Sequence, residues 1–202
     1  MRNTLRLALL IGAAFGATAA NAEQPEGNWM VRFRAVDLRP ANESSGLGGN
    51  NAIHVEDKWI PEVDFSYFFT KNIAAELILT VPQQHDVKLN GTTIGSFKHL
   101  PPTLTLQYHF APDATFRPYV GAGVNYTVIS DDHLVGGAAK LDNDSWGGAL
   151  QMGFDYKIGP NSYLNFDLKK VYIQSDVKVG GAKVAEVKVD PVLIGIGWGF
   201  KF

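Results

Sequence analysis

Apolar and polar side chains alternate along most of this chain, and the alternation is clearest in residues 190–202. One face of that stretch is bulky and apolar, and it consists of Val192, Ile194, Ile196, Trp198, Phe200 and Phe202. The opposite face consists of Leu193, Gly195, Gly197, Gly199 and Lys201. Because successive side chains of a β-strand point to opposite sides, the pattern predicts a strand with one strongly apolar face and one face of small residues.

The same alternation predicts seven further strands, which makes eight in all. The seven begin near residues 29, 59, 73, 100, 116, 146 and 164. Some are joined by tight turns at 70–72, 111–114 and 159–161, and the others by longer polar loops at 40–57, 90–99, 131–145 and 180–181. Near Lys169 and Lys170 the apolar positions change parity, which predicts a β-bulge.

Residues 1–22 have the features of a secretory signal peptide. Arg2 and Arg6 precede a run of small apolar side chains, and Ala20 and Ala22 occupy the two positions that determine cleavage. The apolar run is too short for a membrane-spanning helix. We therefore expect cleavage after Ala22 and a single mature domain, residues 23–202.

The mature chain is mildly acidic and has no cysteine. Removal of Arg2 and Arg6 lowers the Lys and Arg total from 18 to 16 against 20 Asp and Glu, a net charge of −4. This balance argues against a nucleic-acid partner. The scaffold must also be stable without disulfide bonds.

Eight alternating strands predict an all-β barrel, and two kinds of barrel fit them. A soluble barrel of the lipocalin type would bury its apolar faces. An outer-membrane barrel would turn those faces to lipid, with short periplasmic turns and longer extracellular loops. The alternation of short and long connections favours an eight-stranded antiparallel transmembrane barrel, as do the tryptophans near strand ends.

Several motifs resemble the OmpW family of small outer-membrane proteins. They are the stretches 84–91, 95–110 and 117–126 and the Trp-Gly-Phe-Lys-Phe ending at 198–202. The resemblance covers essentially the whole mature chain. It implies an eight-stranded barrel in the outer membrane of a Gram-negative bacterium. It also implies passage of small hydrophobic molecules, with which members of the family, including alkane-uptake relatives, are associated.

The inward-facing residues divide into two predicted groups. The lower, periplasmic group is charged or polar, and we expect a salt-bridge plug formed by Arg32, Arg34, Asp64, Glu76, His109, Arg117, Asp155, Asp167 and Lys201. Charges enclosed in so narrow a barrel must be paired. The upper group predicts an apolar lumen lined by Val36, Leu38, Ile60, Ile78, Ile129, Ala149 and Leu193.

An apolar lumen above a polar plug needs a side exit, and three prolines mark a candidate. Pro82 lies at the outer end of the third strand, and Pro101 and Pro102 lie at the outer end of the fourth. Since proline cannot donate a ladder hydrogen bond, these residues predict a lateral opening between the two strands. The alternative is that they only end the strands at the membrane surface.

The ending Trp198, Phe200 and Phe202 resembles the assembly signal of outer-membrane proteins, so we expect recognition by the barrel-insertion machinery. No metal or cofactor site is predicted, because the five histidines lack metal-ligand spacing. A lipid-modifying enzyme is disfavoured because no nucleophile array is present.

The sequence therefore predicts a non-enzymatic barrel that takes up small hydrophobic solutes and releases them laterally into outer-membrane lipid. A non-transporting structural or receptor barrel and a channel for small polar solutes stay open as alternatives.

Overall fold

A computed structural model describes residues 27–41, 43–46, 53–55, 57–89, 92–134, 139–141, 144–180 and 182–202. The predicted signal peptide and its cleavage site lie outside these residues. Within the described ranges, no helix is long and apolar enough to cross a membrane.

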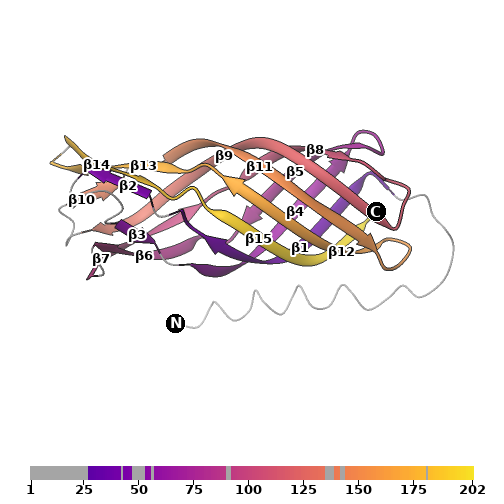
Figure 1. Ribbon diagram of the computed structural model, residues 1–202, viewed down its shortest axis with the longest axis horizontal. Helices are drawn as coiled ribbons and strands as arrows, with labels where there is room; N and C mark the ends of the chain where they lie inside the picture. The colour runs from indigo at the N-terminus through magenta and orange to yellow at the C-terminus, as the bar shows by residue number, and fades with distance from the viewer. Residues whose placement is uncertain are drawn as a thin grey trace.

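Eight long strands close into a barrel (Figure 1). They are β1 (Trp29–Arg39), β4 (Lys58–Phe68), β5 (Ile73–Thr80), β8 (Thr103–His109), β9 (Phe116–Leu134), β11 (Asp144–Lys157), β12 (Ser162–Val171) and β15 (Val192–Lys201). Each pairs antiparallel with the next, and β15 closes the barrel against β1 with Trp198 opposite Phe33. The predicted eight-stranded antiparallel barrel is confirmed.

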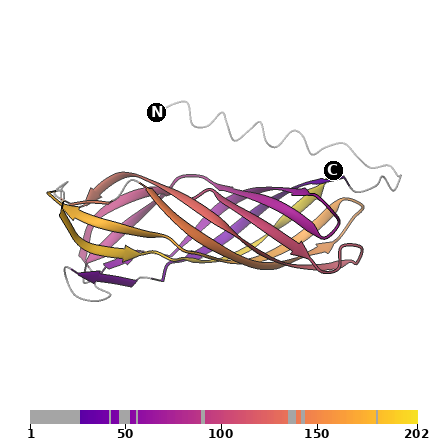
Figure 2. The same ribbon diagram turned by 90° about the horizontal axis from the view of Figure 1, so that it is seen from above.

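Seven further strands extend the wall at the end opposite the C-terminus (Figures 1 and 2). They are β2 (Glu43–Gly46), β3 (Ile53–Val55), β6 (Gln83–Leu89), β7 (Thr92–Leu100), β10 (Ala139–Leu141), β13 (Gln174–Val179) and β14 (Ala182–Lys188). The expectation of irregular loops was wrong for much of these stretches. A strand that is polar on both faces has no apolar alternation, so periodicity cannot reveal it.

The bulge predicted near Lys169 and Lys170 is also wrong. The register of β12 with β11 and β15 runs without a shift through both residues. Lys169, Val171 and Ile173 all point inward and are buried. The facing of the strand is constant, and only the chemistry of its inner face changes, from polar to apolar.

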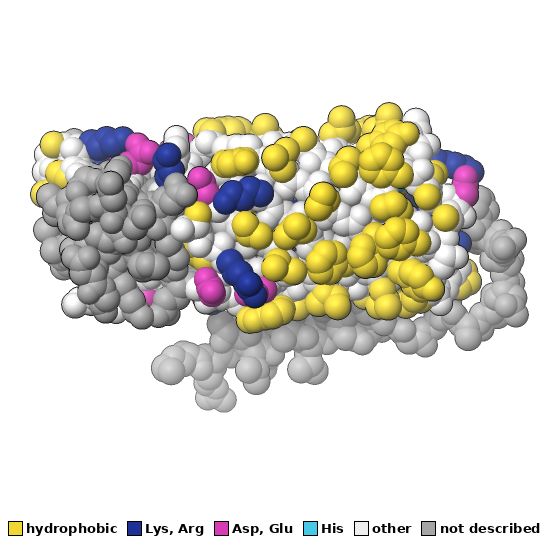
Figure 3. Space-filling view, viewed as in Figure 1, with side chains coloured by type: hydrophobic (Ala, Val, Ile, Leu, Met, Phe, Trp, Pro, Cys, Tyr) yellow, Lys and Arg dark blue, Asp and Glu magenta, His cyan; other side chains and the backbone are white. Residues whose placement is uncertain are grey.

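The barrel buries its charged side chains inside and turns most of its large apolar side chains outward. Arg32 and Asp64 are fully buried, whereas Trp59 and Trp146 are 65% and 68% exposed. Figure 3 shows apolar side chains over the wall and charged side chains toward its two ends. A soluble barrel would have the reverse arrangement, so the structure excludes the lipocalin-type alternative.

Candidate functional site

Two arginines of β1 cross the lower lumen, and the glycines of β15 give them room. A Cβ atom at Gly195 would lie 3.2 Å from Cδ of Arg34, and one at Gly199 would lie 3.2 Å from Cγ of Arg32. The small-residue face of the closing strand is thus the surface against which the arginine stems pack. Larger side chains there would displace both guanidinium groups.

Arg32 binds side chains from three other strands. Its guanidinium donates two hydrogen bonds to the carboxylate of Asp155, at 3.0 and 2.8 Å. It also donates to Ser66 at 2.7 Å and to Glu76 at 3.0 Å, and Asp64 lies 3.3 Å away. This one residue therefore ties β1 to β4, β5 and β11.

Arg34 makes a second set of contacts one step further out. Its Nη1 atom lies 2.9 Å from Glu62 and 2.7 Å from Asp64, and its Nε donates to Asn165 at 2.6 Å. Lys169 joins the same cluster, with Nζ 2.6 Å from Glu62 and 2.9 Å from Asp167. Three cations thus hold five carboxylates from four strands, β4, β5, β11 and β12.

Amide and phenol groups fill the remaining hydrogen-bond positions. Gln107 and Gln151 both donate to Glu76, each at 2.7 Å. Gln151 and the Tyr119 hydroxyl both donate to Asp167, again at 2.7 Å. All of these side chains are buried, so the network excludes bulk water from the middle of the barrel.

A second layer of cations and aromatic rings closes the periplasmic end. Lys201 lies 4.1 Å from the centre of the Phe68 ring, and Arg117 lies 5.0 Å from that of Tyr163. The His109 ring is 5.0 Å from Phe68. The cleft among these residues holds about 10 Å³ of space, room for no more than one water molecule.

The structure buries all nine predicted plug residues but separates them into these two layers. The ion network contains Arg32, Arg34, Asp64, Glu76, Asp155 and Asp167, and the closing layer contains His109, Arg117 and Lys201. The prediction missed Glu62 and Lys169. Glu62 has the same inward parity as Asp64, and the wrongly expected bulge hid Lys169.

The upper lumen is lined by apolar side chains. Six of the seven predicted residues are buried there: Val36, Leu38, Ile60, Ile78, Ala149 and Leu193. The side chain of Ile129 lies outside the described residues. Val36 is paired with Ile60 on β4, and Leu38 with Leu193 on β15, so these side chains share one continuous face. Val171 and Ile173 also belong to this lining and were missed because of the expected bulge.

The wall is interrupted beside this apolar region. The β5–β8 ladder ends at the pair Ile78–Thr103. The next pair between the segments that continue these two strands is Gln83–His99, where β6 pairs with β7. Pro82, Pro101 and Pro102 lie within the interval. On the other side, Tyr126 donates its N–H to the Pro102 carbonyl at 3.1 Å, so this segment stays attached to β9.

The aromatic residues of the C-terminus form a row on the outer wall. Trp198 and Phe200 lie 6.1 Å apart between ring centres, as do Phe200 and Phe202. Phe202 exchanges two backbone hydrogen bonds with Trp29, at 2.7 and 2.9 Å. The last residue thus completes the closure of the barrel at its periplasmic end.

The described residues contain no group of three or more His, Asp or Glu side chains arranged to hold a metal ion. His109 is 3.2 Å from Gln107 and packs between rings. The side chains of the other four histidines lie outside the described residues.

Comparison with known proteins gives consistent matches. The sequence model of the OmpW family matches residues 25–202. The "Uncharacterized outer-membrane protein y4mB" of Sinorhizobium fredii is 40% identical over 98% of this chain and 96% of its own length. Outer membrane protein W of Vibrio cholerae is 35% identical over 96% of this chain and 97% of its own length. The crystal structure of OprG from Pseudomonas aeruginosa covers 90% of this chain and 99% of its own, with a TM-score of 0.75 at 26% identity.

A more distant relative is the dibenzothiophene metabolism operon protein PahQ of Pseudomonas aeruginosa. It is 29% identical over 69% of this chain and 69% of its own length.

Proposed function

The chain belongs to the OmpW family of outer-membrane barrels, and from that premise we propose that it takes up small hydrophobic molecules from outside and releases them sideways into the membrane. The observation that carries the proposal is the position of the wall interruption. It lies next to the apolar lumen and above the closed plug.

The plug argues against a straight path to the periplasm. A solute moving along the barrel axis would have to separate Arg32 from Asp155 and Arg34 from Asp64. Separating buried ion pairs costs several kcal/mol, and the closing layer below adds a second barrier. The polar-solute alternative would require such a path.

The upper lumen offers a surface suited to an apolar solute. Its apolar side chains, among them Val36, Leu38 and Ile60, have no hydrogen-bonding groups for a solute to satisfy. The name of PahQ connects one relative with the metabolism of dibenzothiophene, an apolar aromatic compound. Both points support a small hydrophobic molecule as the substrate class.

The interruption offers the exit. Ile78 is the last residue of β5 that pairs with β8, and it faces the lumen, while Val81 beyond the end of β5 is 53% exposed on the wall. A solute held against Ile78 can therefore reach lipid without crossing a continuous hydrogen-bond ladder. The prolines keep the ladder open because they have no N–H group to donate.

Restoring the ladder tests this route. In the double variant Pro101→Thr and Pro102→Val, the β5–β8 pairing can extend, and uptake of a fluorescent apolar tracer by whole cells should fall toward that of cells lacking the protein. Pro160→Ala, in a periplasmic turn, is the matched control and should leave uptake unchanged. Unchanged uptake in a correctly folded double variant would show that the lateral route is wrong.

The closed plug also supports a second candidate, a non-transporting structural or receptor barrel. Tracer uptake distinguishes the two, because a receptor barrel would leave it equal in cells with and without the protein.

A further inference from the structure

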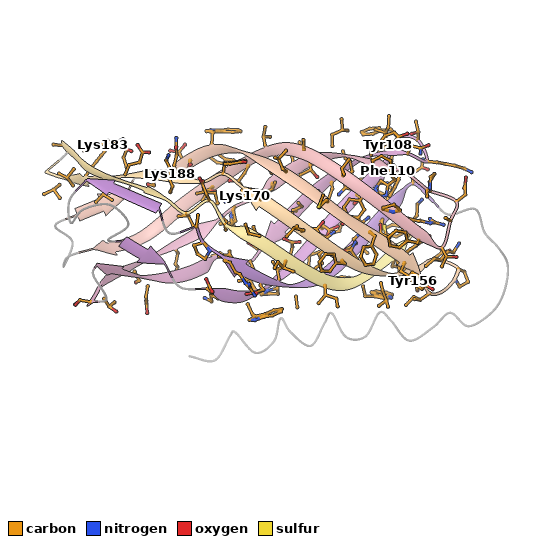
Figure 4. The ribbon with its side chains drawn as sticks, viewed as in Figure 1. Tyr108, Phe110, Tyr156, Lys170, Lys183 and Lys188 are labelled. Carbon is orange, nitrogen blue, oxygen red and sulfur yellow. The ribbon has the colours of Figure 1, made fainter. Side chains whose placement is uncertain are left out.

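One cation interrupts the apolar outer face of β12. Leu164, Phe166 and Leu168 point outward along this strand, and Lys170 follows them on the same face. Tyr172 comes next and is 44% exposed. Figure 4 shows Lys170 near the outer end of the barrel wall, with Lys188 and Lys183 further toward the tip. Lys170 thus lies where the apolar wall ends.

The charge of Lys170 is not neutralised by a described carboxylate. Its Nζ donates to the backbone carbonyl of Asp190 at 2.6 Å and lies 6.0 Å from the centre of the Tyr172 ring. The Asp190 carboxylate accepts the N–H of Ile173 at 2.7 Å. Among the described side chains, none forms an ion pair with Lys170. An ammonium group held in this way can still bind an anion.

A second cation lies on the same outer face. Val192 of β15 pairs with Lys170 on one side and with Arg39 of β1 on the other. The two cationic residues are therefore two strand spacings apart, or about 10 Å. Both side chains are long enough to reach one anion between them. The Arg39 side chain is 58% exposed, and its contact with Asp37 occupies only part of the guanidinium group.

Aromatic residues place this pair at the level of lipid headgroups. Asp37 pairs across the strands with Trp59, and Tyr172 adjoins Lys170. Tyr and Trp side chains mark the boundary between hydrocarbon and headgroups, and a lysine or arginine is costly inside hydrocarbon. Figure 3 shows dark blue groups along the border between the apolar wall and the outer extension. At this border the outer leaflet presents phosphate groups.

We propose that Lys170 and Arg39 form a binding site on the outer wall for the phosphate of a phosphorylated glycolipid of the outer leaflet. The phosphate lies over Val192 and accepts hydrogen bonds from both side chains, and the acyl chains lie along the apolar faces of β12 and β15. The site is separate from the lumen and does not depend on the proposed transport.

Native mass spectrometry of the full barrel from phosphatidylcholine nanodiscs tests the site. The nanodiscs are doped either with lipid A that carries its phosphates or with lipid A from which they have been removed. The wild-type barrel should retain the phosphorylated form preferentially. Lys170→Gln should lower that retention about fivefold, the usual effect of one basic residue at a membrane surface. Lys170→Arg should preserve it.

The control is Lys183→Gln. Lys183 lies near the tip, and its ammonium is 2.6 Å from Asp176 and 2.8 Å from Glu186. The hydrogen bonds that Lys183 donates to Asp176 and then to Glu186 raise the pKa of Lys183 to about 12, so its charge is permanent but neutralised locally. This variant should retain the glycolipid as the wild type does.

Arg39→Gln provides an independent variant that leaves the Lys170 backbone contact intact, and it should also weaken retention. Equal retention of phosphorylated and phosphate-free lipid A by the wild type would overturn the proposal. So would undiminished retention by folded Lys170→Gln and Arg39→Gln barrels.

Discussion

The lower and upper halves of the barrel interior are built on the same strands, yet different interactions hold their side chains. In the lower half each inward side chain has specific partners, as Arg32 has in Asp155, Ser66 and Glu76. In the upper half Val36 and Leu38 only pack, although buried Asn125 nearby donates to Thr103 at 2.8 Å and accepts from Thr127 at 2.6 Å. Buried charges require particular partners, whereas apolar groups do not. The ion network of the lower half is therefore a fixed seal, whereas the apolar side chains of the upper half are held by packing alone.

The composition of the ion network sharpens this contrast. Its carboxylates outnumber its cations: Glu62, Asp64, Glu76, Asp155 and Asp167 face Arg32, Arg34 and Lys169. Amide and hydroxyl donors also bind these carboxylates: Gln107 donates to Glu76, and Gln151 and Tyr119 donate to Asp167. The seal thus depends on uncharged donors as well as on ion pairs.

The largest expected effect comes from removing a cation of the seal. Arg32→Ala should lower the free energy of unfolding by about 3–5 kcal/mol, because it leaves buried carboxylates without their partner. Urea unfolding in lipid vesicles measures this. Lys71→Ala removes a cation whose ion pair with Asp113 is exposed, and it should change stability by less than about 0.5 kcal/mol. Equal effects of the two variants would mean that the network does not hold the barrel together.

Adding bulk under the arginines should have a smaller effect. A Cβ at Gly197 would lie 2.1 Å from the carbonyl oxygen of Phe33 and 2.8 Å from Cγ of Arg34, so Gly197→Ala should destabilise the barrel by about 1–3 kcal/mol through overpacking. Gly148 is the matched control, since a Cβ there would be 3.7 Å from its nearest neighbour, Cδ2 of Tyr172. The same unfolding measurement applies, and a Gly148→Ala variant as unstable as Gly197→Ala would contradict the packing argument.

A polar group in the upper half should affect uptake more than stability. Val36→Thr keeps the side-chain shape but adds a buried hydroxyl, and it should cost about 1 kcal/mol of stability. If the apolar lining binds the solute, uptake of the apolar tracer should also fall. Ser66→Thr, which also creates a threonine but beside the seal and with its hydroxyl already present, serves as the comparison and should leave uptake unchanged in folded barrels. Normal uptake by the Val36→Thr barrel would mean that the apolar lining does not bind the transported solute.

The smallest effect on the folded barrel is expected at the C-terminus. Phe202→Ala keeps both backbone hydrogen bonds to Trp29, so unfolding of the assembled barrel should change by less than about 1 kcal/mol. If the terminal aromatic is an assembly signal, the amount of protein inserted into the outer membrane of cells should nevertheless fall. Normal insertion of this variant would show that Phe202 is not needed as an assembly signal.

Much of the architecture follows from the sequence pattern, for a simple reason. Alternation with period two assigns each residue of a strand to one face, so the eight barrel strands and the inward position of Arg32, Glu76 and Leu193 could be predicted locally. Where that pattern is weak the prediction failed. The polar strands of the outer extension were taken for loops, and the change of chemistry at Lys169 was taken for a bulge.

By itself, then, the sequence determined the number of barrel strands, their two faces and the separation of polar from apolar inward positions, because these depend only on neighbouring residues. The tertiary structure decided which residues meet. Arg32 and Asp155 are 123 positions apart, and they pair only because closure of β15 on β1 completes the ring. Closure likewise places Lys170 and Arg39 on either side of Val192. Such contacts depend on the register of the whole sheet, which no local pattern contains.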